Sequence, residues 1–304
     1  MNSIGKLVQA GFAAFCLLAS ASALAQPSGP WSWTVDAAAV HQPDAGLEDV
    51  QGKVSVSRAF VQPSLNYSWD RRNSLSLSIG AGTSNYEFSN GATIEGAQPW
   101  RDIRDFRISV PIRFSAFDKG DVILIPSVRS YAEKGASLDD GRTEGLFAAA
   151  GWRFSDRLTL GPGFGWFSEL DGGSTLFPIV LINWKVTDRL SISTGGGLAA
   201  TQGPGITMEY RFSDKWQLGL SGRYERVEFA LDDSGPARGG IGEDTSLPLL
   251  LTLTRTLWPM TTVSVLAGLE FDGEMSIESN NSPRFLKSKV ETAPVFGVSF
   301  STRF

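Results

Sequence analysis

His41 is the only histidine of the chain, and acidic residues follow it closely. Asp44, Glu48 and Asp49 share one polar segment with it, which we expect to be a long link at residues 41–51. A histidine base beside acids and serines is what a hydrolase needs. The chain lacks the G-x-S-x-G motif that holds a serine nucleophile on a sharp turn, and an isolated loop histidine is commonly just solvated. The sequence therefore predicts no enzyme, with hydrolysis by His41 kept as an alternative.

No metal site and no cofactor are expected. One histidine and one cysteine cannot form the usual zinc ligand sets. Pairs of acidic residues offer oxygen ligands for calcium, but they lack EF-hand spacing, so we interpret them as solvated loop charge. The glycine-rich runs 161–165 and 195–197 lack the lysine and the helix that phosphate loops need. The acidic pairs are Asp139-Asp140, Asp232-Asp233 and Glu243-Asp244.

Eight charged residues stand on the polar faces of alternating segments. A charge that faces lipid at mid-depth costs about 2–4 kcal/mol for Arg or Lys, so in a membrane barrel these side chains must point into the lumen. There they either line an aqueous pore and set its selectivity or pair across a filled interior. The lumen-lining candidates are Arg107, Arg113, Arg129, Arg153, Arg223, Glu225, Glu270 and Glu291.

The segments that carry these charges alternate apolar and polar residues with period two. In residues 290–304, Phe296, Val298 and Phe300 share one face, while Gly297, Ser299 and Ser301 share the other. A helix with 3.6 residues per turn cannot sort them in this way. Many such segments in series, without helical segments between them, predict one all-β body. The alternation recurs at 74–79, 106–115, 158–166, 216–224 and 262–272.

The connections between these segments alternate in length. Tight turns on one rim and longer links on the other are typical of outer-membrane barrels, as is the cluster of aromatic residues beside the short turns. The segments predict a transmembrane antiparallel up-and-down β-barrel of about fourteen strands, with twelve as the alternative. Short turns are expected near 70–73, 118–120, 156, 188, 214 and 259, and longer links near 41–51, 90–101, 134–142, 232–243 and 274–287.

Two domains are expected: a cleaved signal peptide at residues 1–25 and the barrel at residues 26–304. Lys6 precedes an apolar stretch that is too short to span a bilayer, and Ala23-Leu24-Ala25 offers a cleavage site. No later apolar segment reaches the ~20 residues that a transmembrane helix needs. The formal net charge of −5 and the lack of a basic run oppose binding to nucleic acid.

The end of the chain carries a resemblance. A terminal strand that alternates and ends in phenylalanine, here with Phe300 and Phe304, resembles the signal that the barrel-assembly machinery recognises. The mature chain also resembles an uncharacterised family of proteobacterial outer-membrane barrels, on residues 52–58, 71–77 and 99–102. The resemblance implies the cell outer membrane, contact with its lipids, and that machinery as a partner in biogenesis. It implies no substrate.

Three functions fit this barrel. The first is a passive, porin-like channel for ions or small solutes, whose lumen charges tune what passes. The second is a closed structural or adhesive barrel that presents its outer links. The third is the hydrolase that uses His41. The sequence leaves the solute and the oligomeric state open.

Overall fold

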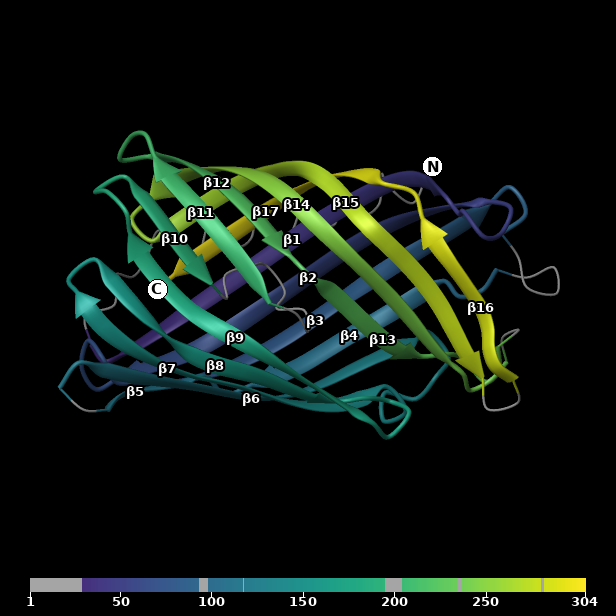
Figure 1. The fold of residues 1–304 in the computed structure, drawn as a ribbon, viewed down its shortest axis with the longest axis horizontal. Coiled ribbons are helices and arrows are strands. Elements are labelled where there is room, and N and C mark those ends of the chain that lie inside the picture. The colour runs from purple at the N-terminus through teal and green to yellow at the C-terminus, as the bar shows by residue number, and fades with distance from the viewer. Residues whose placement is uncertain (1–28, 93–97, 117, 195–203, 235–236, 280–281) are drawn as a thin grey trace.

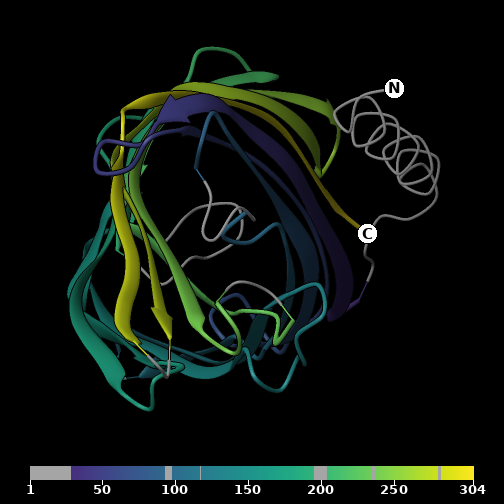
Figure 2. The same cartoon turned by 90° about the vertical axis from the view of Figure 1, so that its right-hand side faces the viewer.

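The protein is a closed antiparallel β-barrel (Figure 1). The structure, a computed structural model, describes residues 29–92, 98–116, 118–194, 204–234, 237–279 and 282–304. Each barrel strand pairs with its neighbours in sequence, and β17 returns to pair with β1 from Thr34–Arg303 to His41–Phe296. Viewed from the end that carries the long links, the strands form a ring (Figure 2).

Three barrel strands are interrupted, at Val110–Pro111, at Tyr224 and at Glu291–Thr292, so the described strand segments make fourteen barrel strands. The predicted fold and strand number are confirmed. The segments are β1 (Trp31–Gly46), β2 (Lys53–Ser68), β3 (Ser74–Ser89), β4 (Asp102–Ser109), β5 (Ile112–Ala116), β6 (Gly120–Glu133), β7 (Arg142–Ser155), β8 (Leu158–Ser168), β9 (Ser174–Lys185), β10 (Leu190–Thr194), β11 (Gly205–Arg211), β12 (Trp216–Arg223), β13 (Glu225–Ala230), β14 (Ile241–Trp258), β15 (Thr261–Ser279), β16 (Ser282–Val290) and β17 (Ala293–Arg303).

The outer face of the barrel is apolar. Leu251, Val265 and Phe296 are each about half exposed, at 50%, 52% and 51%, on faces where the alternation predicted lipid contact. A closed barrel satisfies every backbone hydrogen bond of its wall, and a lipid-facing band covers its apolar exterior. This protein therefore lies in the outer membrane of a Gram-negative cell, in contact with its lipids. None of the described residues forms a helix that is long and apolar enough to cross a bilayer.

The short turns gather at one rim, as the sequence predicts. The turn between β2 and β3 shows why such turns are tight: Asp70 accepts hydrogen bonds from the backbone N–H groups of Arg72 and Asn73, at 2.7 and 2.9 Å. The first of these bonds, with the Asn73 side chain, lowers the pKa of the Asp70 carboxyl. Exposed aromatic residues flank this rim, among them Trp69 and Trp152, and they match the predicted girdle. Short turns face the periplasm in such barrels, so the long links face outward.

Two of the predicted long links are largely strand. β1 continues to Gly46, so His41 lies within a strand, and β15 and β16 together cover most of residues 274–287. The polar ends of these strands keep their backbone pairing, with His41 opposite Ser57 and Ser276 opposite Lys287. Pairing does not require an apolar outward face, so the loss of alternation misled the prediction. The signal-peptide prediction and the 195–197 glycines lie outside the described residues.

The largest apolar cluster of the described chain lies inside the barrel, at the end with the long links. We call its centre the aromatic cluster: Tyr86, Phe88, Trp100 and Phe229. The Phe229 ring is fully buried and lies 5.2 Å from Trp100 and 6.1 Å from Tyr86. β13 reaches across the lumen to make these contacts, because its Ala230 pairs with Ala132 of β6, which is not its neighbour in the wall.

Candidate functional site: the lumen cavity

A cavity of about 940 Å³ lies inside the barrel, and side chains from most strands line it. Its two sides differ in chemistry. Strands β6, β7 and β9 contribute an apolar wall, and strands β1, β2, β4, β12, β13 and β15 contribute most of the charge. The apolar wall consists of Ile123, Ile125, Phe147, Phe177, Ile179 and Leu181.

Glycines on β7 and β8 make room for the rings of the apolar side. A Cβ on Gly165 would lie 2.4 Å from the Phe177 ring, and a Cβ on Gly145 would lie 2.5 Å from the Phe167 ring. Both distances are far below van der Waals contact, so the rings can lie against the sheet only because these positions are glycine. Phe167 and Phe177 stack on each other with 5.9 Å between centroids. Phe167 is buried in this stack, with 7% of its surface exposed, and Phe177 keeps the larger exposure toward the cavity.

The opposite side holds a buried ion network. Arg58 donates to Asp244 at 2.8 Å, and its other terminal nitrogen lies 3.5 Å from Glu270. The Tyr86 hydroxyl donates to the same Asp244 carboxylate at 2.7 Å, which links the network to the aromatic cluster. Buried charges persist in proteins when they are paired and hydrogen-bonded, as these are. The network therefore ties the inward part of β14 to β2.

Two arginines stand opposite each other above the apolar wall. Arg107 of β4 and Arg129 of β6 are direct partners in the register, and both line the cavity and are buried, with 3% and 6% of their surfaces exposed. Arg107 donates to Asp105 at 3.2 Å. The guanidinium of Arg129 lies over the Phe167 ring, 5.1 Å from its centroid. This pair sets two buried guanidiniums side by side in the cavity wall.

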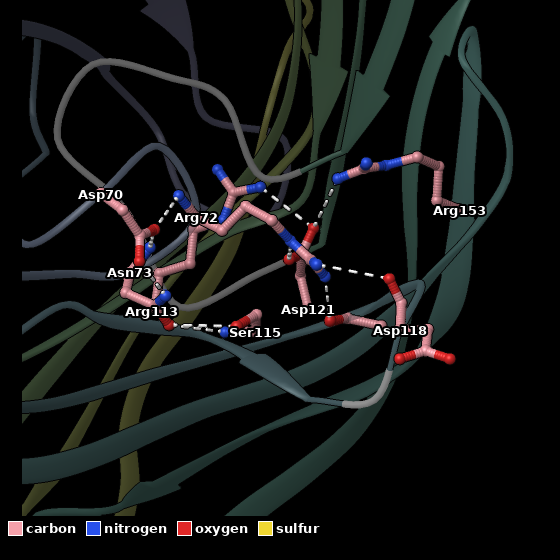
Figure 3. A network of polar contacts seen from close by, with 9 residues as sticks. Asp70, Arg72, Asn73, Arg113, Ser115, Asp118, Asp121 and Arg153 are labelled. Atoms are coloured by element: carbon pink, nitrogen blue, oxygen red, sulfur yellow. Dashed lines mark hydrogen bonds and ion pairs between the residues drawn. The ribbon is translucent and has the colours of Figure 1, made fainter.

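A second polar cluster stands at the short-turn rim (Figure 3). Asp121 is buried and faces three arginines: Arg72 at 3.0 Å, Arg113 at 3.2 Å and Arg153 at 3.8 Å. We call these four residues the rim cluster. Arg72 also donates to the Gly120 carbonyl at 2.6 Å. One carboxylate shared by three guanidiniums leaves this mouth of the barrel positive.

Near the long links the charge ratio is reversed, with one arginine among three carboxylates. Arg226 of β13 lies within 2.7 Å of three carboxylates, those of Glu169, Glu228 and Glu243. Glu228 also accepts the backbone N–H of Leu170 at 3.2 Å. These contacts join β13 to the β8–β9 link and to β14. They hold the inward-turned strand from the side opposite to its aromatic contacts.

Most of the lumen-lining candidates face the interior. Arg107, Arg129, Arg223, Glu225 and Glu270 line the cavity, where Arg223 pairs with Glu225. Arg113 and Arg153 lie in the rim cluster. Glu291 is exposed in the break between β16 and β17, and the structure does not bring it to the cavity.

Sequence reasoning missed Arg58, Asp105 and the apolar wall. Arg58 shares the lumen face of β2 with Gln62, a signal that alternation carries. Alternation gives no such signal for the apolar wall. It predicts a polar lumen face for every strand, whereas these strands direct phenylalanine and isoleucine inward.

His41 faces outward from β1. Its Nδ1 lies 2.9 Å from the Ser57 hydroxyl on β2. One of the acids that follow His41 in the sequence, Asp49, accepts the backbone N–H of Lys289 at 2.9 Å. The His41–Ser57 pair is thus where the hydrolase alternative would have to act, outside the lumen.

No protein-family model matches the chain, and no curated protein matches it. Solved structures of outer-membrane barrels are similar in fold. An outer membrane channel from Pseudomonas putida F1 has 10% identity and a TM-score of 0.49, over 92% of this chain and 97% of that one. A Pseudomonas aeruginosa FadL homologue has 14% identity and a TM-score of 0.45, over 90% and 89%. The P. putida toluene transporter TodX has 10% identity and a TM-score of 0.43, over 92% and 91%.

Proposed function

We propose that this barrel is a passive channel for small solutes, and that solutes cross through the lumen cavity. The observation that carries the proposal is the cavity itself: about 940 Å³ inside a closed wall, with a positive mouth at the short-turn rim. A space of this size holds a small organic solute. A barrel of this strand number also has more interior than its own side chains need, whereas eight strands leave little.

The aromatic cluster narrows the outer part of the lumen. Because Phe229 and Trp100 are almost completely buried there, a wide water-filled pore is not the geometry we propose. The proposed channel instead admits solutes singly, and its arginines at the short-turn rim bias which ions accompany them.

Single-channel conductance of the refolded protein in a planar bilayer tests this proposal. Stable unitary steps are expected, and Arg113→Glu should shift selectivity toward cations because Arg113 is half exposed at the rim. Arg255→Glu is the matched control, since Arg255 lies over Trp216 near the short turns and outside the lumen. A folded barrel without steps, or equal selectivity in both variants, would refute it.

A closed barrel that presents its outer links is the second candidate. The aromatic cluster favours it, because the cluster fills the lumen at the end with those links. In that case solutes would not enter, and shaving of the links by protease on intact cells would abolish function while the barrel remained.

We propose that the chain is not an enzyme. His41→Ala should leave any cellular phenotype of the protein unchanged, whereas loss of a lipase or protease activity in that variant would contradict this.

We also propose that Phe300 and Phe304 serve recognition by the barrel-assembly machinery. Phe304→Ala should lower the yield of folded barrel in cells more than Phe154→Ala, which changes an exposed phenylalanine at the short-turn rim.

A further inference from the structure

Arg129 is a buried cation of the lumen that lacks a carboxylate partner among the residues that the structure describes. Only 6% of its surface is exposed, and its Nε and Nη1 have no hydrogen-bond partner among the described residues. An unpaired buried charge costs several kcal/mol, so an arginine at such a position requires an explanation. The guanidinium lies over the face of Phe167, which supplies no acceptor oxygen.

The charges around Arg129 add up to a positive site. Arg107 stands directly opposite on β4, and like charges at opposed positions destabilise a sheet. Asp105 is the carboxylate next to this pair, and it accepts a hydrogen bond from Arg107. Two further acids of the cavity wall, Glu225 and Glu270, pair with Arg223 and Arg58. Asp36 of β1 and Glu209 of β11 also line the cavity. The Nε and Nη1 of Arg129 lack an acceptor among the described residues, which leaves room beside Arg129 for one further negative charge.

The apolar wall begins directly beside this site. Arg129 and Ile125 lie on the same lumen face of β6, and Phe167 joins the Arg129 guanidinium to the Phe177 ring. An anion bound at Arg129 would therefore place its organic part against the apolar wall, beside Phe177. Arginine presents a planar fork that matches a carboxylate in bidentate fashion.

We propose that Arg129, with Arg107 beside it, binds the carboxylate of an aromatic organic acid whose ring packs against Phe177 in the apolar wall. The inference rests on the proposed channel, for which it names the solute class: single-charged aromatic carboxylates. The ring contributes contact area, and the guanidinium contributes the selection against neutral analogues.

Binding of 2-naphthoate to the full barrel, refolded in detergent, tests the site apart from transport. Titration calorimetry should show that the wild-type barrel binds 2-naphthoate about ten- to a hundred-fold more tightly than the neutral 2-naphthamide, as expected for a charged hydrogen-bonded pair. Arg129→Met keeps the side-chain length without the charge and should remove this preference. Arg255→Met, outside the lumen, should keep it.

The variant also separates a binding role from a structural one. Because Arg129 is unpartnered, Arg129→Met should unfold at the same urea concentration as the wild type or a higher one. If that variant does not fold, the comparison of the acid with the amide on the wild-type barrel still decides the question. Equal affinity for the two compounds, or unchanged naphthoate binding in Arg129→Met, would overturn the site. Conductance without such binding would support the channel and refute the binding site. Binding without conductance would support the binding site and refute the channel.

Discussion

The two ends of the lumen are closed to different degrees by different chemistry. At the end with the long links, Phe229 and Trp100 pack into a dry cluster that β13 crosses the barrel to complete. At the short-turn rim, Arg113 and Arg153 keep 46% and 40% of their side chains exposed around Asp121. Apolar packing inside a barrel stabilises and obstructs, whereas partly exposed charge stabilises little and attracts ions. The comparison assigns stability to one end and ion selection to the other.

The largest stability effect should come from the aromatic cluster. Phe229→Ala removes a fully buried ring and is expected to cost about 3–5 kcal/mol of unfolding free energy. It should also raise conductance, because the ring stands in the lumen. Urea unfolding in detergent checks the first effect and planar-bilayer recording the second. Phe154→Ala, at an exposed site, is the control, and an equal loss in both variants would contradict the assignment.

The ion network between the ends should come next. Arg58→Met leaves Asp244 and Glu270 buried without their cation, with 7% and 9% of their side chains exposed. Breaking such a pair from one side costs about 3–5 kcal/mol, and we expect the lower value because Arg58 itself is 26% exposed. The double variant Arg58→Met with Asp244→Asn should recover part of the loss in urea unfolding. No recovery would show that the two side chains are not coupled.

The apolar wall should tolerate little added volume at its glycines. Gly165→Ala places a methyl group against the Phe177 ring and should cost about 1–3 kcal/mol, with the ring displaced into the cavity. Gly219→Ala is the matched control, since the nearest atom to its Cβ would lie 3.7 Å away. Urea midpoints of the two variants decide the matter. Equal midpoints would mean that the rings do not rest on the sheet.

The rim cluster should affect selectivity more than stability. Asp121→Asn removes the carboxylate that three arginines share, so reversal potentials should move toward anions. The stability loss should be only about 1 kcal/mol, because two of the arginines keep nearly half of their side chains exposed to solvent. A shift of selectivity toward cations would contradict the role of the rim cluster in ion selection. A loss of unfolding free energy as large as that of Phe229→Ala would contradict the assignment of stability to the other end.

The smallest effect is expected outside the lumen. Arg142 and Glu144 form an exposed pair at 3.1 Å on β7, with more than half of each side chain in solvent. Arg142→Ala should therefore change the unfolding free energy by less than about 0.5 kcal/mol. Its conductance should equal that of the wild type, which makes it the baseline for the variants above.

Alternation predicted the wall of this barrel but not its interior. Residues such as Val298 and Leu251 indicate a lipid face, because side chains that face lipid at mid-depth are apolar. No such rule governs the lumen, where Phe177 and Arg129 both face the cavity. Alternation predicts which face of a strand a residue lies on, but it does not predict the direction that the strand takes. The inward course of β13, which carries Phe229, therefore could not be predicted from the sequence.

The strand ends show the same limit. Ser276 and Lys287 pair across β15 and β16 although both are polar, because backbone hydrogen bonds are indifferent to side-chain hydropathy. Candidate charges were found where a polar face interrupts an apolar segment, as at Arg107 and Arg223. Alternation places Arg58 on the lumen face of β2, but its pairing with Asp244, distant in sequence, is visible only in the folded barrel.

Solute uptake into proteoliposomes by two tryptophan variants of neighbouring residues tests the central claim most directly. Gly219→Trp puts an indole into the cavity, and Leu218→Trp puts the same indole on the lipid face of the same strand, where Leu218 is 38% exposed. Passage through the lumen predicts that Gly219→Trp loses most uptake while Leu218→Trp keeps the wild-type rate. Equal uptake by the two folded variants would contradict a permeation path through this cavity.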